Sequence, residues 1–99
     1  MSAAGIALDS RVRWSVDPLA AEVSGNVVLM SIQRGAYYGL DSVGSDIWRR
    51  LTEPTPVSEL CAALQAAYEA DAATLRADVL RFLARLAEEG LIDVLPAGD

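Results

Sequence analysis

The pattern of apolar residues changes at Asp41, and this change constrains the fold more than any other feature of the sequence. Before Asp41, residues 27–33 are rich in residues that favour strands and are apolar on both faces, as in a buried strand. Residues 36–40, AYYGL, follow a turn at Arg34-Gly35, where glycine tolerates the positive φ of hairpin turns. Residues 19–40 therefore predict an antiparallel meander whose last strand is short and lies at the sheet edge.

After Asp41 the apolar residues recur with the helical period, and helices are predicted over residues 42–51, 56–70 and 72–89. Asp41 and Asp71 are the predicted N-caps of the first and third helices, since a carboxylate accepts from free N–H groups of a first turn. Thr55 is the predicted cap of the middle helix, with Pro56 at its first position. Gly90 is the predicted C-cap, with Leu91 folding back onto the last turn.

The helical spacing also predicts which side chains are buried. Gly44, in the first turn of the first helix, is expected to sit close against the sheet. Cys61 is expected to be a small core residue. The predicted buried stripes are Val57, Leu60, Leu64, Ala67 and Tyr68 on the middle helix, and Leu75, Val79, Phe82, Leu83 and Leu86 on the last.

The order of strands followed by helices predicts an α+β fold, with a three-stranded antiparallel sheet followed by three α-helices in a winged-helix-like arrangement. Residues 11–16 form a further extended segment that ends before Pro18, and residues 91–95 a short extended tail. The length of 99 residues fits a single domain, expected over residues 11–95 after a flexible N-terminal arm, residues 1–10.

Charge and composition exclude several classes of partner. The net charge is -6 and the chain contains no Lys, which disfavours binding to nucleic-acid phosphates. No apolar run approaches the roughly 18 residues that a membrane helix needs, so no membrane partner is expected. The N-terminus lacks the features of a signal peptide, and the single Cys61 suits a reducing compartment, so we expect a cytoplasmic protein.

No constellation of catalytic residues is evident. The chain has no His, its glycines form no phosphate-binding loop, and its carboxylates are scattered, so we expect neither an enzyme nor a metal or cofactor site. What remains is a binding surface, because an edge strand exposes N–H and C=O groups that an extended peptide can pair with. The two tyrosines of residues 36–40 are typical of interfaces, although the strand alone favours packing against the core.

Two segments, YYGLDSVGSDIWRRL and ADVLRFLARLAEEGLI, resemble the PqqD-like recognition elements of ribosomally synthesised and post-translationally modified peptide (RiPP) pathways. More narrowly, the chain resembles the stand-alone leader-peptide-binding proteins of lasso-peptide pathways. The tyrosine pair before Gly39, Gly44 with Trp48, and the DVLRFL of the last helix carry the resemblance. Asp41 departs from the family pattern, where asparagine is more frequent.

The resemblance implies that the leader of a precursor peptide adds as an antiparallel strand to the edge strand 35–40, in the groove against the last helix. The strand residues of the implied site are Gly35, Ala36, Tyr37, Tyr38, Gly39 and Leu40. The implied groove wall is Leu75, Asp78, Val79 and Phe82, with Arg81 or Arg85 available for a carboxylate of the leader.

The resemblance also implies two enzyme partners, a transglutaminase-like leader peptidase and an ATP-dependent macrolactam cyclase, to which the bound precursor is presented. Three alternatives remain at this point: a PqqD-type chaperone of another RiPP or quinone-cofactor pathway, a winged-helix DNA-binding regulator, and an oligomerisation module. The near balance of charge on residues 71–89 disfavours the DNA-binding alternative.

Overall fold

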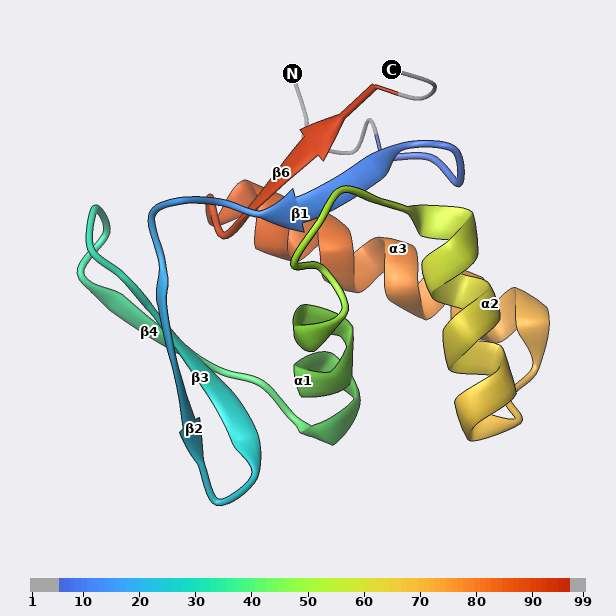
Figure 1. Ribbon diagram of the computed structural model, residues 1–99, viewed down its shortest axis with the longest axis horizontal. Coiled ribbons are helices and arrows are strands. Elements are labelled where there is room, and N and C mark those ends of the chain that lie inside the picture. Colours follow the sequence, from blue (N-terminus) through green and yellow to red (C-terminus); the bar gives the residue numbers. More distant parts are fainter. Residues whose placement is uncertain (1–5, 97–99) are drawn as a thin grey trace.

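The computed structural model describes residues 6–96 and confirms an α+β fold with three helices after a three-stranded antiparallel sheet (Figure 1). The helices are α1 (Ser42–Arg49), α2 (Val57–Tyr68) and α3 (Ala72–Glu88). The strands are β1 (Arg11–Trp14), β2 (Leu19–Val23), β3 (Asn26–Ser31), β4 (Ala36–Gly39), β5 (Thr55–Pro56) and β6 (Ile92–Leu95).

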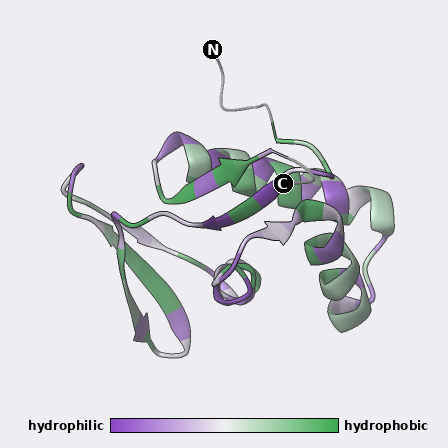
Figure 2. Cartoon of the chain, turned by 45° about the horizontal axis from the view of Figure 1, so that its top comes forward, coloured by the Kyte–Doolittle hydropathy of each residue, from purple (hydrophilic) through white to green (hydrophobic). Residues whose placement is uncertain are grey.

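The predicted meander is the sheet β2-β3-β4, which projects to one side of α1 while α2 lies on the other (Figure 1). In the central strand β3, the side chains of Val27, Leu29 and Ser31 are buried, and they alternate with less buried neighbours. Strands β2 and β4 are both edge strands, as the order β2-β3-β4 requires. Figure 2 shows hydrophobic residues, in green, along the strands of this projecting sheet.

A second three-stranded sheet, β5-β1-β6, was not predicted as a unit. Strand β1 pairs antiparallel with both β5 and β6, so the expected extended tail after Leu91 is a strand of this sheet. The prediction that Thr55 caps α2 and that Pro56 is its first residue is wrong. Pairing with Arg11 and Val12 holds both residues in an extended conformation, so the helix begins at Val57.

Backbone carbonyls near the N-terminus take the place of a side-chain cap on α2. The N–H of Val57 donates to the carbonyl of Ser10, and the N–H of Ser58 donates to the carbonyl of Leu8, both at 2.9 Å. Residues 6–10, which we expected to belong to a flexible arm, instead satisfy two free N–H groups of this helix. Residues 1–5 of the expected arm lie outside the described residues.

The ends of α3 follow the prediction. The Asp71 carboxylate accepts from the N–H of Thr74 at 2.9 Å, and this hydrogen bond lowers the pKa of Asp71. At the other end Gly90 has a φ of +75°. The N–H of Leu91 donates to the carbonyl of Leu86 at 2.9 Å, and the N–H of Gly90 donates to the carbonyl of Ala87 at 3.0 Å. These are the bonds of a Schellman motif, and they bury Leu91 completely.

The core lies where the three helices meet both sheets. It includes all the leucines and valines predicted to be buried on α2, together with Cys61, but Ala67 and Tyr68 are exposed. These last two residues lie in the last turn of α2. Trp48 is buried, and Trp14 stacks on it with ring centroids 5.2 Å apart. Among residues 6–96, no helix has the length and apolarity needed to cross a membrane.

Candidate peptide-binding groove

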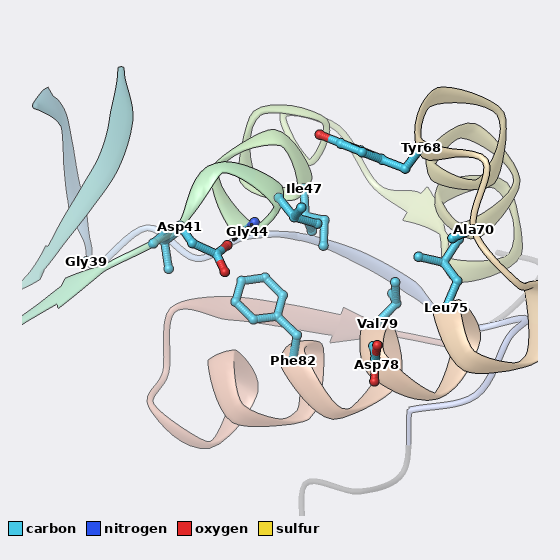
Figure 3. Close-up of a pocket in the computed structure, with 12 residues that line it drawn as sticks. Gly39, Asp41, Gly44, Ile47, Tyr68, Ala70, Leu75, Asp78, Val79 and Phe82 are labelled. Atoms are coloured by element: carbon cyan, nitrogen blue, oxygen red, sulfur yellow. Dashed lines mark hydrogen bonds between the residues drawn. The ribbon is translucent and has the colours of Figure 1, made fainter. Parts of the chain in front are cut away.

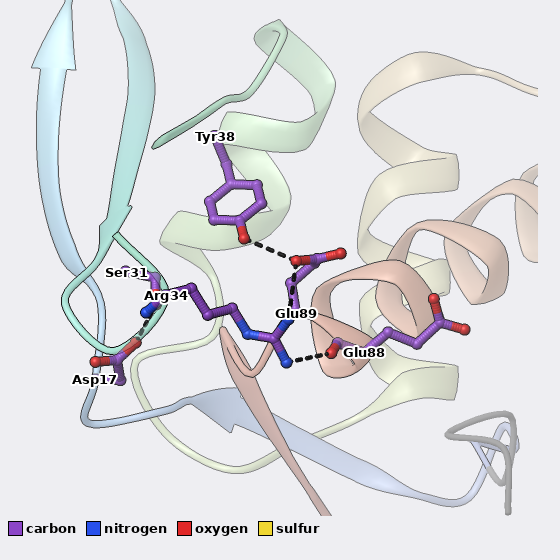
Figure 4. Close-up of polar contacts among 6 residues, drawn as sticks. All are labelled: Asp17, Ser31, Arg34, Tyr38, Glu88 and Glu89. Carbon is purple, nitrogen blue, oxygen red and sulfur yellow. Dashed lines mark hydrogen bonds and ion pairs between the residues drawn. The ribbon is translucent and has the colours of Figure 1, made fainter. Parts of the chain in front are cut away.

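The start of β4 is fixed by a polar network in the β3–β4 hairpin (Figure 4). The buried hydroxyl of Ser31 donates to the Asp17 carboxylate at 2.7 Å and accepts from the N–H of Arg34 at 3.1 Å. Gly35 has a φ of +62°, and its N–H donates to the carbonyl of Ser31 at 2.9 Å. The turn therefore needs glycine at this position, as the sequence indicates.

Polar contacts join this hairpin to the end of α3 (Figure 4). The Tyr38 hydroxyl donates to the Glu89 carboxylate at 2.7 Å, and this hydrogen bond raises the pKa of Tyr38. Arg34 contacts the same carboxylate at 3.4 Å and donates to the carbonyl of Glu88 at 3.0 Å. These contacts join the hairpin turn and the middle of β4 to the end of α3.

The other end of β4 is held by α1. The N–H of Leu40 donates to the carbonyl of Val27 at 2.9 Å. The buried Ser45 hydroxyl accepts from the N–H of Val27 at 2.8 Å and donates to the carbonyl of Leu40 at 3.4 Å. A side chain of α1 thus completes the β3–β4 ladder and fixes where the strand ends.

The ladder determines which backbone groups of β4 are open. Hydrogen-bonded residues alternate along an antiparallel pair, and Leu40 bonds to β3, so Tyr38 also directs its N–H and C=O groups toward β3. Tyr37 and Gly39 therefore direct theirs toward the free edge. Gly39 has no atom within 4 Å of where a Cβ would lie, so the face of the sheet on that side of the strand is open at Gly39.

Asp41 caps α1 as predicted, accepting from the N–H of Gly44 at 2.7 Å. The first turn of α1 lies against the sheet, as expected, because Ser45 accepts from the N–H of Val27. The side of Gly44 on which a Cβ would lie faces Phe82 of α3 instead. A Cβ at Gly44 would lie 3.1 Å from Phe82 Cζ and 3.2 Å from Asp41 Oδ1. Glycine at this position lets the aromatic ring of α3 approach the first turn of α1.

Between β4, α1 and α3 lies a largely apolar cavity of about 510 Å³ (Figure 3). Phe82 lies beside Asp41 and Gly44 in this view, and Tyr68 reaches across from the end of α2 toward Ile47. The Tyr68 hydroxyl donates to Asp46 at 2.9 Å, which closes the far end of the cavity. The lining residues are Gly39, Leu40, Asp41, Val43, Gly44, Ile47, Tyr68, Ala70, Leu75, Asp78, Val79 and Phe82.

A second cavity of about 440 Å³ continues along the same strand toward the end of α3. It shares Gly39, Leu40 and Phe82 with the first, so the two form one groove beside β4, which we call the β4–α3 groove. This second half is more polar. Its other lining residues are Tyr37, Tyr38, Arg85, Leu86, Glu89 and Leu91.

The structure brings most of the predicted site residues to this groove. The four residues of the predicted wall line its apolar half, and Tyr37, Tyr38 and Arg85 line its polar half. Gly35, Ala36 and Arg81 line neither half, and Arg81 is paired with Asp78.

The site predicted from the sequence lacks nine lining residues: Val43, Ile47, Asp41, Gly44, Tyr68, Ala70, Leu86, Glu89 and Leu91. The sequence of α1 contains a signal for the first two, because Val43 and Ile47 are four residues apart and therefore share one face of the helix. Nothing local in the sequence indicates that Tyr68 or Glu89 reaches the groove.

The side chains at the groove favour binding over chemistry. Within residues 6–96, no group of three or more His, Cys, Asp or Glu side chains is arranged to hold a metal ion. The thiol of Cys61 is buried, and burial raises its pKa, which makes it a poor nucleophile. The groove offers an open strand edge, an apolar wall and a guanidinium, which together can bind an extended peptide.

Comparison with known proteins identifies the family. The family model described as Coenzyme PQQ synthesis protein D (PqqD) matches residues 26–92. A search among curated proteins gave no match.

Two solved structures are similar over nearly the whole chain. TbiB1, solved in complex with the TbiA(beta) leader peptide, is 36% identical, with a TM-score of 0.76 over 88% of this chain and 99% of that one. The PqqD truncation of Methylobacterium extorquens PqqCD, a stand-alone RiPP recognition element solved by NMR in solution, shares the fold at 21% identity. Its TM-score is 0.78, over 94% of this chain and 99% of that one. The match over residues 26–92 and the relative at 36% identity show that the chain belongs to the PqqD family.

Proposed function

We propose that this protein is a RiPP recognition element that binds the leader of a precursor peptide as an additional antiparallel strand on β4. The observation that carries the proposal is the open edge of β4, which runs along the β4–α3 groove. Tyr37 and Gly39 direct N–H and C=O groups toward this edge, and the side chains of the added strand would enter the groove.

The same sheet has a second open edge at β2, but the β4–α3 groove lies beside β4 alone. All five residues of β2 are exposed, and Glu22 is paired with Arg49 of α1. The cavity between β2 and α1 has a volume of about 230 Å³, which is smaller than either half of the β4–α3 groove. Backbone pairing alone gives affinity with little sequence demand, whereas pockets beside the strand give specificity. A specific leader therefore fits β4 better than β2.

The relative TbiB1 supports the proposed ligand, because it was solved with a leader peptide bound and matches 88% of this chain. The resemblance to the recognition elements of lasso-peptide pathways points to a leader peptidase and an ATP-dependent macrolactam cyclase as the enzymes that receive the bound precursor. The recognition element would then be a cytoplasmic adaptor without catalysis of its own, carried by the domain of residues 11–95. Tethering the precursor raises its effective concentration at each enzyme.

A fluorescence-polarisation titration tests this proposal. The probe is a fluorescein-labelled synthetic leader of the precursor encoded beside the gene. The variant Val43→Asp places a charge in the apolar half of the groove, at a side chain that is 37% exposed in the first turn of α1, where an acidic residue is tolerated. The control Val94→Asp places the same charge on β6, at a side chain that is 39% exposed and lies outside the groove.

The proposal predicts saturable binding in the nanomolar to low-micromolar range for the wild type and for Val94→Asp, and a rise in Kd for Val43→Asp. Absence of binding up to about 100 µM, where the binding free energy would be weaker than about -5 kcal/mol, would refute leader recognition for that precursor. Equal loss of binding in both variants would refute the groove as the site.

A further inference from the structure

The arginines of this protein are almost all engaged. Among residues 6–96, only Arg76 and Arg85 have neither an ion pair nor a side-chain hydrogen bond. Arg76 lines a small separate cavity beside α2, whereas Arg85 lines the polar half of the β4–α3 groove. The groove therefore contains one uncompensated guanidinium, in a chain with a net charge of -6.

The carboxylate of Glu89, which could pair with Arg85, has other partners. Glu89 lies four residues further along the chain, at a separation that often forms an ion pair near a helix end. Its carboxylate instead accepts from the Tyr38 hydroxyl at 2.7 Å and contacts Arg34 at 3.4 Å. Arg81, the other candidate for a leader carboxylate, is paired with Asp78. Arg85 is therefore the cation of the groove that is left for a ligand.

The contacts of β4 also give the direction of a bound strand. Tyr38 contacts Glu89 just beyond α3 and lines only the polar half of the groove, whereas Asp41, which follows β4, lines only the apolar half with Asp78. Strand β4 therefore runs opposite to α3. A leader strand antiparallel to β4 runs in the same direction as α3, so it passes the apolar half of the groove first and Arg85 afterwards.

We propose that the leader carries an Asp or Glu on the C-terminal side of its apolar groove-filling residues, and that this carboxylate pairs with the guanidinium of Arg85. Arg85 is then a specificity-determining residue that reads one acidic position of the leader. This inference rests on the proposed function, and it adds the chemistry and the order of the residues that the ligand must contain.

The expected effect is modest and depends on salt. Arg85 is exposed, so water and ions screen its attraction for a carboxylate. We expect Arg85→Ala to raise the Kd for the leader by about three-fold to ten-fold at low ionic strength, as for a charge-assisted hydrogen bond that is partly screened. The ratio of the Kd of Arg85→Ala to that of the wild type should fall toward one when the salt concentration rises to about 1 M.

A double-mutant cycle tests the pairing. Each Asp and Glu of the labelled leader is replaced in turn by its amide, and every peptide is titrated against wild type, Arg85→Ala and Arg76→Ala. The control Arg76→Ala removes the same charge from the same helix but leaves the groove intact. The amide peptides keep nearly the same size while they lose one charge.

The inference predicts that one amide replacement, at a position C-terminal to the apolar residues of the leader, raises the Kd for the wild type. With that peptide, wild type and Arg85→Ala should have the same Kd. Arg76→Ala should bind every peptide like the wild type. If the leader binds tightly but Arg85→Ala weakens the binding of all peptides equally, or of none, the proposed carboxylate pairing is wrong and leader recognition stands. If no peptide binds the wild type, leader recognition itself is wrong, and the pairing with it.

Discussion

Replacing Gly39 by proline removes one backbone donor from the open edge of β4 and changes little else. The N–H of Gly39 points away from β3, so the β3–β4 ladder loses no hydrogen bond. Tyr38, which precedes the new proline, is already extended, as a residue before proline prefers. The control Gly39→Ala keeps the N–H, and its Cβ would meet no atom within 4 Å.

A backbone hydrogen bond contributes about 1 kcal/mol net, so Gly39→Pro should raise the Kd for the leader about five-fold. Gly39→Ala should bind within about two-fold of the wild type, because it keeps the pairing group. Fluorescence polarisation gives both values, and thermal unfolding shows whether the variants are folded. Equal affinities of the proline and alanine variants, at any level, would refute pairing through the N–H of Gly39.

Three further predictions concern the groove and the core. Leu83→Ala should lower the free energy of unfolding, measured in urea, by about 2–5 kcal/mol, because this side chain is fully buried. Gly44→Ala should weaken leader binding, because the added Cβ pushes the Phe82 ring toward the groove. It should change the melting temperature less, because the higher helix propensity of alanine, about 1 kcal/mol, offsets the crowding. Hydrogen bonds to carboxylates raise the pKa values of Tyr38 and Tyr68 above the ordinary value of 10.0. The protonated tyrosines therefore stabilise the fold below about pH 10, and this stabilisation is lost as the pH rises through the raised pKa values. Replacing both tyrosines by Phe should therefore flatten the fall in melting temperature above pH 10; an unchanged fall would contradict this assignment.

Local chemistry made much of the fold predictable from the sequence. Asp41 and Asp71 cap their helices because a carboxylate three residues before a free N–H can reach it without help from the rest of the chain. Gly90 and Leu91 form their motif within the last turn of α3. The meander of residues 19–40 follows from alternating side chains and tight turns, which are also local.

Features that depend on distant partners were not predictable in this way. The sheet β5-β1-β6 joins segments from the two ends and the middle of the chain, and its pairing converts Thr55 from a helix cap into a strand residue. Gly44 approaches Phe82 because of how α1 and α3 cross, which helical periodicity does not encode. Tyr68 reaches the groove for a similar reason, since its position depends on Asp46 of another helix.

The central claim is that the leader becomes a strand on β4, and amide hydrogen exchange followed by NMR tests it most directly. In the free protein, the amides of Tyr37 and Gly39 face the open edge and should exchange faster than those of Tyr38 and Leu40, which bond to β3. Adding saturating leader should slow exchange at Tyr37 and Gly39 while leaving the open-edge amides of β2 unchanged. Saturable binding without slower exchange at Tyr37 and Gly39, or with new protection along β2, would contradict the account.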